Sequence, residues 1–275
     1  MATTDAVDAK QPAVAEIHRP RRRLGRIITG SIVPRIILIP AAALFIIPFY
    51  WMLVSALKST SELTKFPPTL IPGAWVWSNF IDAVNYIPFG LYAFNSFVIT
   101  LGVTIGAVLS NTVVAYGFSR IQWPGRNIMF YICIATLFLP LIVPAFFGNP
   151  FYIFLMRQFM LGIPKELSDA ARVDGATEIQ TFWKVILPLA KPAVVVVAIF
   201  AAVAAWNDFL LPLLYLQDSS KYPLAVGLAF YTSEHDVAYN LLMAAATLVV
   251  LPVVVVFIFA QRFFVEGITV GGVKG

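Results

Sequence analysis

Three consecutive side chains in an apolar part of the sequence could bind a hydroxyl-bearing ligand. Trp206, Asn207 and Asp208 lie about fifteen residues into an apolar stretch that begins near Pro192, so a helix would carry them about 22 Å into a membrane core of roughly 30 Å. A carboxylate at that depth is costly in lipid and should face a cavity or a polar partner. Indole faces and amide or carboxylate edges suit sugars, but Asp208 could instead cap a helix or bond to a neighbouring one.

Two further polar side chains are weaker candidates for a substrate pathway. Asn95 and Asn111 lie on the apolar stretch 93–118, where an amide more often forms a hydrogen bond between helices.

The sequence offers little for metal binding or catalysis. Glu234, His235 and Asp236 are adjacent, and three adjacent ligands do not converge on one ion, so we expect a solvated turn and no metal site. Cys133 is the only cysteine, which excludes an internal disulfide. Because there is no Walker A sequence and no nucleophile–base pair, we expect a chain that is not an enzyme and binds no cofactor.

A polar segment, 165–191, separates two apolar stretches. A helix is expected to begin near Glu166 and to carry a small apolar strip, and Asp174-Gly175 then allows a bend. The strip consists of Leu167, Ala170 and Ala171. A second helix, about 176–186, leads into the next apolar stretch. The resulting helix–turn–helix could dock on another protein or rest on lipid headgroups.

Composition indicates the environment that positions these residues. The sequence is 60% hydrophobic and 12% charged, with a mean hydropathy of +0.84, whereas a soluble domain is about a quarter charged. We therefore expect an all-α membrane protein with about six transmembrane helices. The expected spans are 35–57, 93–118, one from about 128, a shortened fourth before 162, 190–216, which Asn207 and Asp208 break chemically, and 238–260. The fourth is in question because residues 128–161 supply only about 51 Å of helix, whereas two crossings need about 60 Å.

The basic residues report topology rather than nucleic-acid binding. The net charge is +5, but the Lys and Arg side chains lie at the ends of apolar stretches. With the Arg-rich start inside, the positive-inside rule places 58–92 and 217–237 outside, and 119–127 and 165–191 inside. Both termini are then cytoplasmic. We divide the chain into a mobile tail (1–30), a membrane domain (31–264, with the loop 164–188) and a carboxyl-terminal tail (265–275).

Small residues recur every four positions in the second span. Gly102, Gly106 and Ser110 share one helical face and would let another helix approach closely. Packing within the same chain is the favoured interpretation, and contact with a partner subunit is the alternative.

The segment "DAARVDGATEIQTFWKVILPLAKP" resembles the EAA loop of binding-protein-dependent ABC importer permeases. That motif is Glu-Ala-Ala, three residues, Gly, nine residues and Ile-x-Leu-Pro; Asp169 replaces the Glu and Val185 the first Ile. "SALKSTSEL", "AYGFSRIQWPGRN", "AWNDFLLPL" and "GITVGGVKG" look like the MalG-like carbohydrate permeases. Relative to these, the region 140–157 lacks roughly 25 to 30 residues, about the length of one span and a loop.

The resemblance implies a subunit of a carbohydrate importer in the bacterial cytoplasmic membrane. A second permease subunit, two ATPase subunits that use ATP and Mg, and an extracytoplasmic solute-binding protein are the implied partners. The implied ATPase-coupling residues are Glu166, Asp169, Ala170, Ala171, Gly175, Leu187 and Pro188, and the implied carboxyl-terminal ATPase contacts are Gly271, Gly272 and Lys274. Asp169 would pair with a basic group of the ATPase. Since the family keeps Asp208 across different sugars, a capping role is favoured for it.

Two other classes of function stay open at this point. One is a secondary transporter driven by an ion through Asp208, although no internal repeat supports it. The other is a membrane assembly subunit whose cytoplasmic helix docks a partner without substrate flux. Which sugar is carried cannot be read from the sequence, because the binding protein makes that choice.

Overall fold

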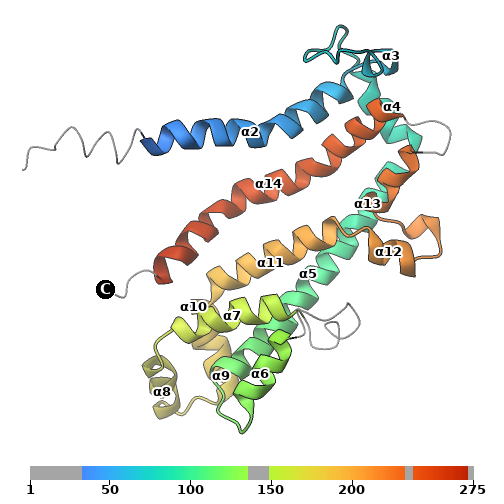
Figure 1. Ribbon diagram of the computed structural model, residues 1–275. Helices are drawn as coiled ribbons and strands as arrows, with labels where there is room; N and C mark the ends of the chain where they lie inside the picture. Colours follow the sequence, from blue (N-terminus) through green and yellow to red (C-terminus); the bar gives the residue numbers. More distant parts are fainter. Residues whose placement is uncertain (1–32, 136–148, 233–237, 272–275) are drawn as a thin grey trace, which may run out of the picture. The chain divides into compact units, whose positions relative to one another are not determined.

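The computed structural model describes residues 33–135, 149–232 and 238–271, with side chains over 35–135, 149–232 and 238–261. All regular elements in these ranges are helices (Figure 1). The chain divides into two units, Met1–Tyr50 and Trp51–Gly275, which we describe separately.

The first unit contains most of helix α2 (Val33–Ala56), whose last turns lie in the second unit. The helix is apolar on all sides, as a membrane span requires, and it confirms the first expected span. Pro40 and Pro48 lie inside it, which membrane helices tolerate more readily than soluble ones.

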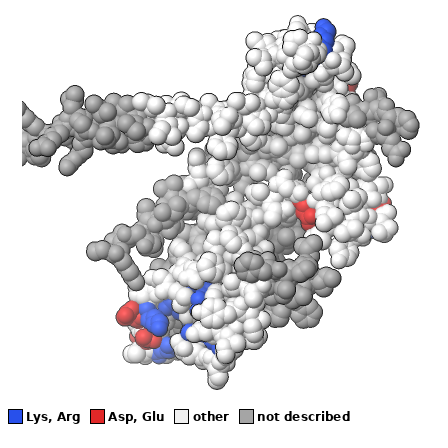
Figure 2. Space-filling view, viewed as in Figure 1, with Lys and Arg blue, Asp and Glu red and all other residues white. Residues whose placement is uncertain are grey.

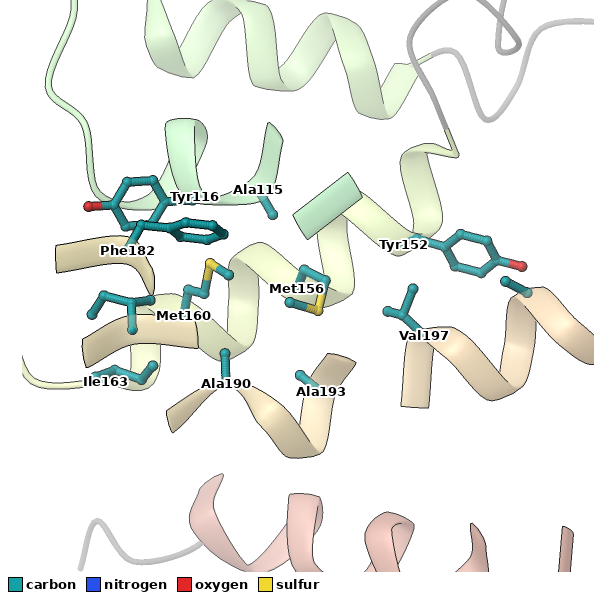
Figure 3. Packing of buried hydrophobic residues seen from close by; sticks show 12 residues of the cluster. Ala115, Tyr116, Tyr152, Met156, Met160, Ile163, Phe182, Ala190, Ala193 and Val197 are labelled. Carbon is teal, nitrogen blue, oxygen red and sulfur yellow. The ribbon is translucent and has the colours of Figure 1, made fainter. Parts of the chain in front are cut away.

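The second unit is built around helices α5 (Phe89–Ser119), α7 (Pro150–Gly162) and α11 (Lys191–Trp206). Helix α5 packs along both α11 and α7. Their shared core joins alanines of α5 and α11 to the long side chains of Met156 and Met160 of α7 (Figure 3). Alanines let the helices approach closely, and methionine fills the remaining space.

A second core lies among the remaining helices of this unit. Helices α4 (Ser78–Tyr86), α13 (Leu224–Gly227) and the start of α14 (Tyr239–Gly271) enclose the buried side chains of Tyr92 and Tyr231. Short helices α3 (Thr60–Leu63) and α12 (Leu210–Tyr215) belong to the connecting segments.

Within the described part of the chain, three helices are long and apolar enough to cross a membrane by themselves: α2, α5 and the 239–261 part of α14. A fourth crossing is possible if the bent pair 178–189 and 191–206, at 77°, forms one span. Helix α6 (Arg126–Ala135) has ten residues and α7 has 13, about 15 and 20 Å against a core of roughly 30 Å. The six expected crossings are therefore not confirmed, and residues 136–148, between these two helices, lie outside the described part.

The expected span 190–216 is interrupted at Asn207 and Asp208, where the sequence placed its polar break. Helix α11 ends at Trp206, and α12 begins only at Leu210. Asn207 ends the first helix, and the Asp208 carboxylate accepts a hydrogen bond from the Leu211 N–H at 3.2 Å. Polar side chains that bond to the local backbone compete with helix continuation, which explains the break.

Helix α14 extends beyond the expected last span. Its backbone continues to Gly271, so residues 265–271 of the expected tail are helical. Two of the implied carboxyl-terminal ATPase contacts, Gly272 and Lys274, lie outside the described residues.

Candidate functional site: a polar helix–turn–helix and a polar cavity

The polar segment folds as a helix–turn–helix, as the sequence predicted. Helix α8 (Glu166–Val173) ends in a turn whose Gly175 has φ +82°. The Gly175 N–H donates to the Arg172 carbonyl at 3.0 Å, and the Ala176 N–H donates to the Ala171 carbonyl at 2.9 Å. This pair of bonds is the Schellman motif, which requires a left-handed residue that glycine supplies without strain.

The second helix differs from the expected continuous α-helix over 176–186. Helix α9 (Glu178–Thr181), capped by Thr177, leads into π-helical turns over Phe182–Ile186 and then into the short α10 (Leu187–Leu189). Pro188 has no N–H to donate, which favours a change of hydrogen-bond pattern here. A bend of 77° follows before α11 begins.

The helix–turn–helix leaves apolar side chains uncovered. In α8, Val173 is 87% exposed and Leu167 is 41% exposed, while Ile179 of α9 is 71% exposed. Figure 2 shows Lys, Arg, Asp and Glu side chains gathered around this segment of the second unit. Exposed apolar groups among charges are typical of a surface that contacts a partner.

The charges of this segment pair with one another. The Arg172 guanidinium lies 3.0 Å from the Asp169 carboxylate and 2.7 Å from that of Glu178. The hydrogen bond to Glu178 raises the pKa of Arg172, so this side chain stays charged. Asp169, implied to pair with a basic group of another subunit, is 66% exposed and has Arg172 as a partner within its own chain. Such exposed pairs are worth about 0 to 1 kcal/mol, so a competing partner could displace this one.

A cavity of about 450 Å³ lies among α5, α7 and α11 in the second unit. Its apolar lining is broken by five polar side chains: Ser110, Asn111, Asn149, Tyr152 and Asp208. Cavities of this size, largely apolar with a few converging polar groups, are typical of small-molecule sites.

The cavity contains two of the five predicted pathway residues, Asn111 and Asp208. The other three hold the fold together. The Asn95 amide donates to the backbone carbonyls of residues 220 and 222. The Trp206 indole donates to the Val249 carbonyl. The Asn207 amide donates to the Val203 carbonyl. The bonds of Asn95 agree with its interpretation as a side chain that forms hydrogen bonds between segments, and those of Trp206 and Asn207 give them a structural role too.

Sequence reasoning missed three cavity residues. Asn149 and Tyr152 carry no local signal for a ligand site, and Ser110 was singled out only as a small residue of the second span. Asn149 reaches the cavity because its N–H donates to the Asn111 side-chain oxygen at 3.1 Å, across 38 positions of sequence. Only the pairing of α5 with α7 brings these residues together.

The small-residue face of α5 does not pack as expected. A Cβ atom added at Gly102 or Gly106 would meet no other atom within 4 Å, so the expectation of close packing against the same chain was wrong for both. Gly106 and Ser110 instead line the cavity.

No metal site is found among the described residues, where no three His, Cys, Asp or Glu side chains come together. The adjacent Glu234, His235 and Asp236 lie outside that part of the chain.

Known proteins resemble this chain over most of its length. The arabinooligosaccharides transport system permease protein AraQ of Bacillus subtilis is 31% identical over 258 residues, covering 84% of this chain and 92% of AraQ. The diacetylchitobiose uptake system permease protein NgcG of Streptomyces coelicolor is 32% identical, covering 86% of both chains. The same fold is found in a chain from the crystal structure of a bacterial ABC transporter involved in the import of the acidic polysaccharide alginate. The two chains superpose with a TM-score of 0.71 at 24% sequence identity, and the match covers 89% of this chain and 99% of that one.

The alignment with AraQ also bears on the length of this chain. It runs over 258 residues but uses only 84% of the 275 present here, so part of AraQ has no counterpart in this chain. The part of AraQ without a counterpart agrees in size with the roughly 25 to 30 residues that the region 140–157 was expected to lack.

Residues 18–270 match the family described as the binding-protein-dependent transport system inner membrane component. This match covers the α5, α7 and α11 core as well as the helix–turn–helix. The chain therefore belongs to that family of transporter membrane subunits.

Proposed function

We propose that this chain is a permease subunit of an ATP-driven ABC importer for a carbohydrate. It forms half of a translocation pathway with a second permease subunit and works with two ATPase subunits and an extracytoplasmic binding protein. The family membership carries the proposal, and the relatives AraQ and NgcG, whose names specify arabinooligosaccharides and diacetylchitobiose, support the substrate class.

The loop 164–188 is the proposed coupling segment. Its exposed apolar side chains offer a partner a surface to bury, and its turn is fixed by Gly175. Since the chain carries no nucleotide-binding motif, the segment transmits movement made by the ATPase rather than performing chemistry.

The cavity among α5, α7 and α11 is the proposed part of the sugar pathway. Hydroxyl, amide and carboxylate groups converge there, and each can exchange hydrogen bonds with a sugar hydroxyl. Asp208 keeps its cap on α12 through one carboxylate oxygen, which leaves the other oxygen for a ligand.

Reconstitution tests the function. The chain, its permease partner, the ATPase and the binding protein are placed in proteoliposomes, and uptake of labelled arabino- and chito-oligosaccharides is followed with and without ATP. We expect uptake that needs ATP and every component. Uptake by the chain alone under an ion gradient would support a secondary transporter, and a complex that assembles without flux would support an assembly subunit.

A matched pair of variants tests the cavity. Gly106→Leu fills the cavity, whereas Gly102→Leu lies one turn away on the same helix, outside the cavity, and neither Cβ meets another atom. In complexes that assemble normally, Gly106→Leu should lower uptake about tenfold or more and Gly102→Leu should not. Equal effects of the two variants would remove the cavity from the pathway.

A further inference from the structure

Arg120, at the cytoplasmic end of α5, is a buried charged residue that the proposed function leaves without a role. It is 8% exposed, and no carboxylate pairs with it among the described side chains. A buried guanidinium without a counter-ion needs several hydrogen-bond acceptors to offset its lost hydration.

Arg120 finds these acceptors on two other elements. Its Nη2 donates to the carbonyls of Met160 and Ile163, at the carboxyl end of α7, the latter at 2.7 Å. Its Nη1 lies 3.5 Å from the hydroxyl of Ser168, the one buried residue of α8. The last carbonyls of a helix favour a cation, so this side chain joins α5 to the ends of both α7 and the coupling segment.

Tyr116, one turn earlier on α5, reaches the other half of the segment. Its hydroxyl donates to the Glu178 carboxylate at 3.0 Å, and that carboxylate also accepts from Arg172 of α8. The Tyr116 ring packs on Phe182, with centroids 4.7 Å apart, as Figure 3 shows. Helix α5 therefore holds both α8 and α9.

Helix α7 connects these contacts to the cavity. Its 13 residues span about 20 Å, with Ile163 following one end and the Asn149 cap at the other. Asn149 is bonded to Asn111 of α5, and both line the cavity together with Tyr152. Helices α5 and α7 are thus tied to each other at both ends.

We propose that Arg120 and Tyr116 are the positioning residues that transmit displacement of the α8–α9 segment to α5 and α7, and so to the cavity. Movement of α8 pulls on Arg120, and movement of α9 pulls on Tyr116. Because α7 is short and hydrogen-bonded to α5 at both of its ends, it moves together with α5. This movement changes the positions of the cavity-lining residues around Asn149. This inference rests on the proposed function, since it assigns the path by which the coupling loop acts.

The test compares uptake per ATP hydrolysed in the reconstituted complex. Arg120→Gln keeps a polar side chain but cannot bridge both α7 carbonyls and α8. We expect normal assembly and ATP hydrolysis, with uptake per ATP reduced about tenfold, as is typical of lost coupling between sites. Arg120→Lys, which keeps the charge, should recover part of the loss. Arg126→Gln is the control, because Arg126 lies in the turn that follows α5 and, among the described residues, donates to the carbonyl of Ile121 within that turn.

Tyr116→Phe is the second variant, for the case that Arg120→Gln does not assemble. It removes only the hydroxyl and keeps the ring on Phe182, so we expect about a threefold loss of uptake per ATP. Trypsin cleavage after Lys165 in the assembled complex should quicken in both variants and stay unchanged in Arg126→Gln, because the segment is no longer held by α5.

The outcomes separate this inference from the proposed function. If the wild-type complex does not transport with ATP, the proposed function fails and the linkage fails with it. If the wild-type complex transports while assembled Arg120→Gln and Tyr116→Phe keep its uptake per ATP, only the linkage is overturned. A loss of the same size in Arg126→Gln would also overturn it.

Discussion

Replacing Gly175 with alanine should weaken binding of the ATPase without damaging the membrane core. The Gly175 backbone has φ +82°, and a Cβ there would meet no atom within 4 Å, so the whole cost is conformational. A left-handed conformation costs a non-glycine residue about 1 to 2 kcal/mol. That energy lowers the equilibrium ratio of the turn to its alternative conformations by a factor of about 5 to 30.

The turn sets the angle between α8 and α9 because its two hydrogen bonds end α8. If the ATPase recognises the helix–turn–helix as one surface, its affinity should fall by up to that factor of about 5 to 30, which is reached when the turn is the minor conformation in the variant. The assay is equilibrium binding of purified ATPase to the solubilised pair of permease subunits. Gly175→Asn should lose less, since asparagine tolerates this conformation better than alanine.

Gly125→Ala is the matched control. Gly125 has φ +83°, also has no atom within 4 Å of an added Cβ, and lies in the turn between α5 and α6. It should cost the same local energy but leave ATPase affinity unchanged. Wild-type affinity in Gly175→Ala, or an equal loss in Gly125→Ala, would refute the assignment of 164–188 as the coupling segment.

Three predictions concern the outer part of the second unit. Gly227→Ala would place a Cβ 2.6 Å from the Tyr92 ring, so the thermal midpoint of the purified chain should fall by an amount corresponding to about 1 to 3 kcal/mol. Asn79→Ala removes two buried hydrogen bonds from the side chain to backbone carbonyls, at 2.8 and 2.9 Å. The free energy of unfolding should fall by about 1 to 3 kcal/mol in the same thermal measurement. An unchanged midpoint would contradict the stabilising role of these buried hydrogen bonds. The Gly73 N–H holds the pKa of Glu62 below 4.5, so this carboxylate stabilises its loop above about pH 4.5. That stabilisation should disappear as pH falls through the lowered pKa, and the Gly73 amide should then lose protection against hydrogen exchange. In Glu62→Gln this dependence of the protection on pH should be absent.

Local sequence patterns predicted the elements that depend on local chemistry. The long apolar stretches predicted the first, second and last membrane helices, because apolar length is what a span needs. Asp174-Gly175 predicted the turn, because a left-handed position requires a residue such as glycine. The spacing of Asp169, Ala170, Ala171 and Gly175 led to the family that the comparisons confirm.

Local pattern was less informative where helices are interrupted by their own side chains. Asn207 and Asp208 are compatible with the middle of a span or with a break between two helices, and the break is found because each bonds to nearby backbone. The same ambiguity affects the segment after α9, where π-helical turns replace a plain α-helix. Hydrophobicity alone does not distinguish these outcomes.

The sequence by itself determined the membrane environment, the principal spans, the glycine turn and the family, since each depends on residues close together in the chain. Only the tertiary structure decided which polar side chains meet. Asn111 and Asn149 line one cavity, and Arg120 joins α7 to α8, because α5 packs against α7 across about 40 positions of sequence. Such contacts depend on the relative placement of packed helices, which no periodicity within a single helix records.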